Sequence, residues 1–337
     1  MPRSRGRGTG TTTKLAVLAL VTILAVAAVL ELRGGEGGER QFLEHAAASL
    51  VAPLDLVTTA ARANRLVLLA DIAGSGTVKR FAAEVIDTLA RTSGLDAVAL
   101  DIDADQQPWI DRYLLSRPED PSILLQRPST LHDAEGTGRD YLEIYRAVWR
   151  LNDELGADRA IRIIALDPPA WSSALSASPS GAARLYGQRD GFMAERIDER
   201  LLERNARARI LFFVGGLHAL RGTAQVQTGG TSPVPVVPLA ERLARSYPND
   251  VYSILVDAPL ARTPPTVVAK YRGTTYEEAI RRRLIARPSR FALRIGEPFA
   301  YENDPIRFFA KPGIEFSLVP RNQPLHERAD AYVYIEN

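Results

Sequence analysis

The sequence predicts an α/β domain with a mainly parallel β-sheet and helices on both faces, preceded by one N-terminal transmembrane helix. Two observations indicate the domain: short runs that are apolar throughout, and amphipathic stretches of helical spacing between them. Strands that are apolar on both faces are typical of a parallel sheet buried between two layers of helices. A third observation, one long apolar run near the N-terminus, indicates the transmembrane helix.

The apolar run covers residues 15–30, in which only Thr22 is polar. It is a little short for a hydrocarbon core of about 30 Å, but the flanks of the segment 14–32 can extend it by snorkelling. Basic residues precede it, which places residues 1–13 in the cytoplasm and the body outside, in a periplasmic or extracellular position. The alternative is a cleaved signal peptide, but Ala25–Ala27 offers a cleavage site only inside the apolar run. We therefore expect a signal anchor.

The rest of the chain divides into a spacer and one domain. Residues 33–39 are rich in glycine and predict a flexible spacer. Residues 40–337 contain no clear linker, so we expect a single extracytoplasmic α/β domain. It begins with a helix over residues 40–62 that breaks at Pro53, where a second helix can start.

Strands and helices then alternate. Apolar runs predict strands at residues 65–70, 97–102, 160–166, 209–214, 251–256 and 329–335. Helical spacing predicts a helix that begins after Gly74-Ser75-Gly76 and ends at Gly94, and others at residues 140–155, 190–205, 237–246 and 277–286.

Charge and composition exclude several classes of function. Residues 1–40 hold six of the 42 basic residues and three of the 40 acidic ones, which leaves 36 basic and 37 acidic residues in the remainder. A body so close to neutral has no overall field that attracts nucleic acid. The chain has no cysteine, so disulfides, thiolate metal sites and cysteine nucleophiles are excluded.

Polar residues gather where the predicted strands end. They are Asp71, Asp101, Asp103, Asp167 and the segment Gly215-Gly216-Leu217-His218. Ligands of open parallel sheets bind beyond the carboxyl ends of the strands. Carboxylates with one imidazole suit a hard or borderline metal ion, or general acid/base chemistry. The alternative for each aspartate is a structural role as a cap, whereas His218 follows a Gly-Gly bend that lets the backbone approach a ligand.

Other patterns are weaker or fail. Asp101-Ile-Asp103-Ala-Asp105 is not a calcium loop, because Gln106 and Arg112 stand where glycine and a bidentate glutamate are needed. No G-x-S-x-G, Walker or H-E-x-x-H motif occurs. The densest basic stretch is either a solvated helix face or a docking patch for acidic lipid headgroups or an acidic partner. It contains Arg281, Arg282, Arg283, Arg287, Arg290 and Arg294.

The order of these motifs resembles the superfamily of erythromycin esterases and ChaN-like haem-binding (Tiki) proteins. Leu69–Gly74 stands in the place of that family's Gly-Glu-x-His-Gly motif, Leu100–Ile102 in that of its apolar-Glu motif, and Val214–His218 in that of its bend before a histidine. Residues 161–169 and 189–193 are also similar to its intervening stretches. The resemblance implies the fold, esterase-like chemistry, and a metal or haem as cofactor.

The departures from the family matter for function. Ala73 stands where the first histidine belongs, and the aspartates Asp71 and Asp101 stand where the family has glutamates. Alanine cannot ligate a metal or accept a proton, and the shorter carboxylates withdraw by about 1.5 Å, which spoils a tuned geometry. We therefore expect a non-catalytic binding or accessory protein that docks on a membrane protein complex.

Two alternatives remain open. One is a hydrolase or metal-dependent enzyme that uses His218 with Asp71, Asp101 and Asp167. The other is a haem-binding protein with His218 or a surface tyrosine as axial ligand, which rests on the family resemblance alone.

Overall fold

The structure is a computed structural model. It describes residues 50–72, 75–127, 138–171, 179–228, 232–258, 270–271, 274–275, 289–295, 307–311, 314–319 and 325–336. The chain divides into two compact units, Met1–Ala48 and Ser49–Asn337, and everything below concerns the second. The predicted anchor, the spacer, the helix at 277–286, Ala73 and Arg281–Arg287 lie outside the described residues. In the described part of the chain, no helix is both long and apolar enough to cross a membrane.

The centre of the unit is a seven-stranded sheet with the order β10-β13-β7-β1-β4-β2-β3. All neighbouring strands are parallel except β10, which runs antiparallel to β13 at one edge. The strands are β1 (Leu66–Asp71), β2 (Ala97–Asp103), β3 (Arg162–Asp167), β4 (Ile210–Gly215), β7 (Val251–Asp257), β10 (Arg290–Arg294) and β13 (Ala331–Ile335). This confirms the mainly parallel sheet.

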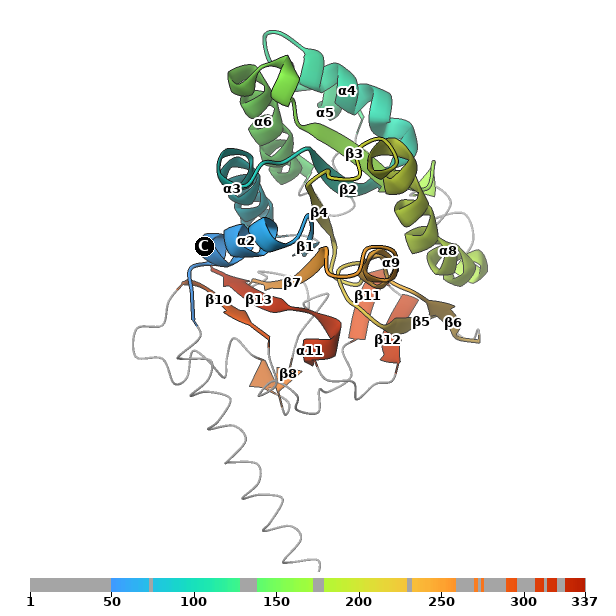
Figure 1. Cartoon of the computed structure of the whole chain (residues 1–337). Coiled ribbons are helices and arrows are strands. Elements are labelled where there is room, and N and C mark those ends of the chain that lie inside the picture. Colours follow the sequence, from blue (N-terminus) through green and yellow to red (C-terminus); the bar gives the residue numbers. More distant parts are fainter. Residues whose placement is uncertain are drawn as a thin grey trace, which may run out of the picture. The chain divides into compact units, whose positions relative to one another are not determined.

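Helices cover both faces of this sheet (Figure 1). The helices α2 (Pro53–Ala63), α3 (Gly76–Thr92) and α6 (Gly138–Leu155) lie on one side. The helices α8 (Pro179–Ile197) and α9 (Leu239–Ser246) lie on the other. Right-handed crossover connections explain why the helices lie on two faces. From β1 to β2 and β3 the chain moves toward one edge of the sheet, which puts α3 and α6 on one face. From β3 to β4 and β7 it moves toward the other edge, which puts α8 and α9 on the opposite face.

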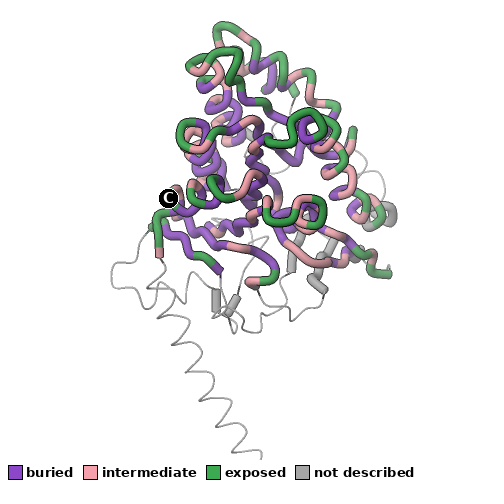
Figure 2. The backbone as a smooth tube through the Cα atoms, viewed as in Figure 1, coloured by how far each residue is buried: buried purple, intermediate pink, exposed green. Residues whose placement is uncertain are grey.

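The sheet forms the core. All residues of β1 and of β2 are buried, aspartates included, and the strands appear as buried segments between partly exposed helices in Figure 2. The strands predicted from apolar runs are confirmed to within two residues at either end. A helix that begins at Pro53 is also confirmed, since proline is well placed in the first turn of a helix, while residues 40–49 of the predicted first helix lie outside the described residues.

Some predictions need correction. The helix predicted at 190–205 begins earlier, at Pro179, and its last part, Asp198–Leu202, is a π-helix. Two helices, α4 (Gln107–Leu115) and α5 (Ser122–Leu125), were not predicted.

A second sheet of order β11-β12-β5-β6 was also not predicted. Its strands are β11 (Arg307–Lys311), β12 (Ile314–Val319), β5 (Thr223–Thr228) and β6 (Val234–Val236). The remaining short elements are the hairpin β8 (Lys270–Tyr271) and β9 (Thr274–Thr275), and the helix α11 (Leu325–Arg328).

Candidate functional site

The predicted polar residues meet at the carboxyl edge of the four strands β1, β4, β2 and β3. Their register places Asp71 opposite Gly215, and Asp103 opposite Asp167. All described buried aspartates belong to this edge or to the helix beside it. Together with three basic side chains they form what we call the strand-end cluster: Asp71, Asp101, Asp103, Asp167, Asp190, Lys79, Arg189 and His218.

Asp71 is held by two donors of the helical layer. The ammonium group of Lys79, in the first turns of α3, donates to Asp71 Oδ1 at 2.7 Å and to the carbonyl oxygen of Ile72 at 2.8 Å. The hydroxyl of Tyr141, on α6, donates to Asp71 Oδ2 at 3.0 Å. Burial and the carboxylates of Asp71 and Asp101 raise the pKa of Tyr141 well above its ordinary value, so it remains a neutral donor. Both oxygens of Asp71 are therefore engaged within the chain.

Asp167 forms a bidentate pair with Arg189 of α8. The two nitrogen–oxygen distances are both 2.7 Å, and the guanidinium also lies 3.6 Å from Asp101 Oδ2. Burial alone would lower the pKa of Arg189, but the carboxylates of Asp167 and Asp101 raise it above its ordinary value. Its guanidinium lies over the ring of Trp171, 4.9 Å from the centroid. Arg189 is thus a permanent cation inside the cluster.

His218 is oriented by a carboxylate that the sequence did not single out. Its Nδ1 lies 2.7 Å from Asp190 Oδ1, which also accepts the backbone N–H of Leu239 at 2.7 Å. A carboxylate at Nδ1 assigns the proton of the neutral ring to that nitrogen and leaves Nε2 as an acceptor. The bend predicted from Gly215-Gly216 is confirmed, because the N–H of His218 donates to the carbonyl oxygen of Gly215 at 2.9 Å.

Among the cluster aspartates in the described part of the chain, Asp101 alone has a buried oxygen without a hydrogen-bond partner. Its Oδ2 accepts the N–H of Gly215 at 3.0 Å, whereas its Oδ1 is buried and has no hydrogen-bond partner. The side chain lies beside His218: a methyl group built on Gly215 would meet Asp101 Oδ2 at 3.4 Å and His218 Cδ2 at 3.6 Å.

Sequence reasoning missed the partners of these residues, namely Lys79, Tyr141, Arg189 and Asp190. One signal was available for Lys79: it shares the apolar face of α3 with Ala82 and Ile86, where a charged residue needs a buried counter-ion. Arg189 and Asp190 fall in the stretch 189–193, to which the motif resemblance had pointed.

Among the described residues, no group of three or more His, Asp or Glu side chains is placed to hold a metal ion. The predicted metal site therefore has no support from these residues. Of the basic stretch, the described Arg290 pairs with Glu84 at 2.8 Å.

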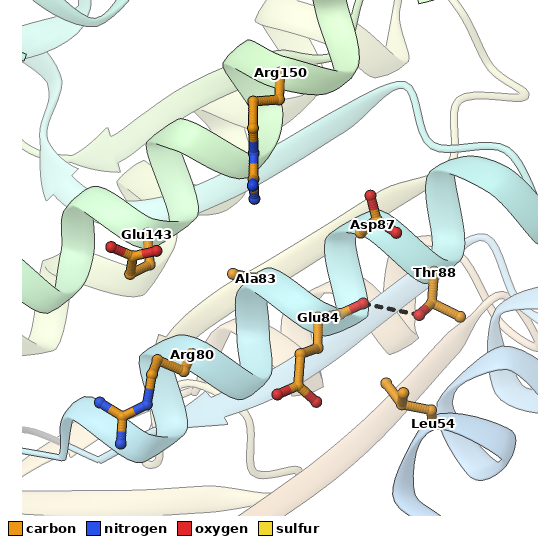
Figure 3. A pocket seen from close by; sticks show the side chains of 8 residues that line it. All are labelled: Leu54, Arg80, Ala83, Glu84, Asp87, Thr88, Glu143 and Arg150. Atoms are coloured by element: carbon orange, nitrogen blue, oxygen red, sulfur yellow. Dashed lines mark hydrogen bonds between the residues drawn. The ribbon is translucent and has the colours of Figure 1, made fainter. Parts of the chain in front are cut away.

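A groove of about 420 Å³ lies elsewhere, between α2, α3 and α6 (Figure 3). It is lined by charged residues of both signs, such as Arg80, Glu84, Asp87 and Arg150, and includes no member of the strand-end cluster. Its charges are largely satisfied locally, for example by the pair of Asp87 with Arg91. We therefore place the candidate site at the strand ends.

Comparison with known proteins agrees with this fold. No protein-family model matches the chain, and no curated protein matches it in sequence. Among solved structures, erythromycin esterase EreC, a histidine-to-asparagine mutant in its open conformation, gives a TM-score of 0.55 at 13% identity over 83% of this chain and 92% of that one. The chain has the erythromycin esterase fold.

Two other structures extend the likeness. A Bacillus cereus protein gives a TM-score of 0.58 at 12% identity, and a succinoglycan biosynthesis protein gives 0.60 at 9% identity. Each match covers 88% of this chain and 97% of the other. The resemblance predicted from the motifs is thus confirmed for the fold, while identities this low leave the activity to be argued from the site.

Proposed function

We propose that this chain is a membrane-anchored, extracytoplasmic binding or accessory protein whose esterase-like domain does not catalyse, and that it docks on an integral-membrane complex. The observation that carries the proposal is the pairing of Asp71 with Lys79 and of Asp167 with Arg189. The carboxylates that would act in catalysis are neutralised by cations of the chain itself.

The pairing of Asp71 bears directly on catalysis. A general base must be free to reach and take a proton from the reacting group. Asp71 accepts from Lys79 and from Tyr141, so each of its oxygens already holds a donor of the chain itself. Ala73, the residue in the place of the family's first histidine, has no ionisable group. The geometry thus supports a fold that is kept while the chemistry of its first motif is lost.

The membrane part of the proposal rests on the sequence. The apolar segment 14–32 with its basic flank favours an anchor whose N-terminus is cytoplasmic, and the glycine-rich spacer 33–39 lets the domain stand off the bilayer. A tether raises the effective concentration of the domain near membrane partners.

Purification of the full chain from native membranes in mild detergent tests the proposal. We expect a stoichiometric complex that survives size-exclusion chromatography. The matched control is a variant that begins at residue 40 and lacks the tether, which should be recovered from the soluble fraction. Migration of the full chain solely as a free monomer would contradict the accessory role.

A second candidate function, hydrolysis with His218 as general base, is favoured by one observation. The short contact between Asp190 and His218 Nδ1 is the arrangement that orients a catalytic histidine in hydrolases. If His218 is the base, Asp190→Asn should lower ester turnover by roughly 10⁴-fold, as the wrong tautomer does in serine proteases. The exposed Asp105→Asn is the control and should leave turnover unchanged. Turnover that is insensitive to Asp190→Asn would remove this candidate.

A further inference from the structure

The strand-end cluster carries more negative than positive charge. Besides Asp103 it contains four buried aspartates, of which Asp71 and Asp167 are paired with Lys79 and Arg189. His218 is neutral when its single ring proton sits on Nδ1 toward Asp190. Uncompensated carboxylates in a protein interior are costly, so a cluster of this composition favours an added cation over a neutral group.

Asp101 carries the acceptor that the cluster leaves unpaired. Its carboxylate is 3% exposed, and Oδ1 is buried without a hydrogen-bond partner in the part of the chain described. A buried acceptor left unpaired costs about 1–3 kcal/mol, and more when it is charged. Because this oxygen is sealed from bulk water, its donor must arrive with a ligand or with a bound water molecule.

His218 supplies a second acceptor beside it. Its Nδ1 is occupied by Asp190, and Nε2 has no hydrogen-bond partner among the described residues. The ring edge that carries Cδ2, the carbon bonded to Nε2, borders the same side of Gly215 as the Asp101 carboxylate does. Two acceptors with a net negative charge are complementary to a group that has several N–H donors and a positive charge.

We infer that the strand-end cluster binds its ligand through a primary ammonium group held between Asp101 Oδ1 and His218 Nε2. This inference rests on the proposed binding function and adds the chemical class of the ligand. An ammonium carries three donors and one charge, whereas an alcohol satisfies one acceptor and leaves the excess charge in place. With no metal cluster among the described residues, an organic cation fits the acceptors better than a divalent ion.

Titration of the full chain in detergent with n-propylammonium and with 1-propanol tests the inference. The two probes have the same heavy-atom skeleton and differ in charge and in the number of donors. In protein labelled with ¹⁵N-histidine, the Nε2 signal of His218, assigned by its loss in His218→Gln, should shift with n-propylammonium and not with 1-propanol. An equal response to both probes, which would indicate a neutral-donor or water site, overturns the inference, and so does no response to either.

Two variants locate the site. Asp101→Asn replaces the carboxylate by a neutral amide, which has an NH₂ donor in place of one acceptor oxygen. It should weaken n-propylammonium binding at least about tenfold, close to 1.4 kcal/mol. Gly215→Ala places a methyl in contact with both the Asp101 carboxylate and the His218 imidazole, at ordinary contact distances, so it should fold and bind at least about tenfold more weakly. Asp105→Asn, an exposed carboxylate after the same strand, should bind as the wild type does. Unchanged binding in both site variants refutes the assignment.

Failure of this inference is separable from failure of the proposed function. If n-propylammonium does not bind while the chain forms a stoichiometric membrane complex and shows no turnover, the ammonium site is wrong and the accessory role stands. If n-propylammonium binds and His218-dependent ester turnover is found, the non-catalytic role is wrong and the ligand class stands.

Discussion

Lys79 is the cation that pairs with Asp71. It is 1% exposed, and its ammonium group reaches Asp71 from the helix that follows β1. Burial of both charges is costly, so the pair is stable only because the lysine also donates to a backbone carbonyl and lies over the Tyr141 ring at 5.3 Å. A pair of this kind fixes a carboxylate in place and, in the function we propose, keeps it out of proton transfer.

Removal of this cation should destabilise the fold. Lys79→Met leaves Asp71 as a buried charge without its counter-ion, and we expect a loss of about 3–5 kcal/mol in the free energy of unfolding, measured by urea denaturation. Adding Asp71→Asn to that variant should recover part of the loss, because the uncompensated charge is then gone. Arg80→Met, at the exposed neighbouring position, is the control. A loss below about 1 kcal/mol in Lys79→Met would mean that the pair does not hold the site together.

Buried tyrosines should make the folded protein less stable at alkaline pH. Burial is the largest cause that raises the pKa values of Tyr113, Tyr141 and Tyr145 above the ordinary value, and burial with the hydrogen bond to Asp198 raises that of Tyr247 to about 12. In the unfolded chain these groups lose their protons near pH 10, at which the folded protein retains them. The unfolded state then binds fewer protons, so the free energy of unfolding falls as pH rises above about 10.

Two measurements check this effect of pH. The free energy of unfolding should be lower at about pH 11 than at about pH 9, and the tyrosinate absorbance of the folded protein should stay incomplete until it unfolds. Complete ionisation of all tyrosines near pH 10 without unfolding would contradict the burial of the α6 tyrosines.

At the scale of the elements, Gln107 completes the edge of the main sheet. This side chain at the start of α4 donates to the carbonyl oxygen of Ile163 at 2.7 Å and accepts the N–H of Ala165 at 2.9 Å. It thereby pairs the outer edge of β3 as a neighbouring strand would. An edge strand covered in this way is protected from pairing with another chain.

Gln107→Ala should cost about 1–3 kcal/mol in the free energy of unfolding, because two backbone groups of β3 lose their partner. The adjacent Gln106→Ala removes only a bond to the exposed Asp105, and its cost should stay within about 0.5 kcal/mol. Thermal or urea unfolding of the two variants side by side measures the difference. Equal stabilities would show that water replaces the glutamine at this edge.

The sequence predicted the elements that depend on local patterning. Fully apolar runs such as residues 66–70 and 210–214 located the central strands, because a strand buried on both faces must be apolar throughout. Strand β5 was missed, since only Ala224 and Val226 alternate with polar residues and the signal is short. Helix α4 buries only Ile110, Tyr113 and Leu114, too few to be distinguished from a loop.

The site was predicted only in part, because local patterning locates the strand ends but not the side chains that pack against them. Strand ends placed Asp71, Asp101, Asp167 and His218 together, which follows from parallel pairing. Apart from Lys79, their partners come from more distant helices: 70 residues separate Asp71 from Tyr141, and 22 separate Asp167 from Arg189. Such pairs arise from tertiary packing, which spacing within one element does not reveal.

At the scale of the whole molecule, the proposal joins an anchor to a domain in which Asp71 and Asp167 are paired with cations of the chain itself. The full chain should remain with membranes after alkaline carbonate washing, because an apolar helix partitions into the hydrocarbon core. The variant that begins at residue 40 should appear in the supernatant. Release of the full-length chain by carbonate would indicate that residues 15–30 are removed or do not span the bilayer.

The central claim is that this esterase-like domain binds and does not catalyse. The most direct measurement is the turnover of a broad panel of esters and peptides by the purified full chain, beside His218→Ala. We predict rates equal to those of buffer for both proteins, because Asp71 and Asp167 are held by Lys79 and Arg189. Turnover by the wild type that disappears in His218→Ala would contradict the claim.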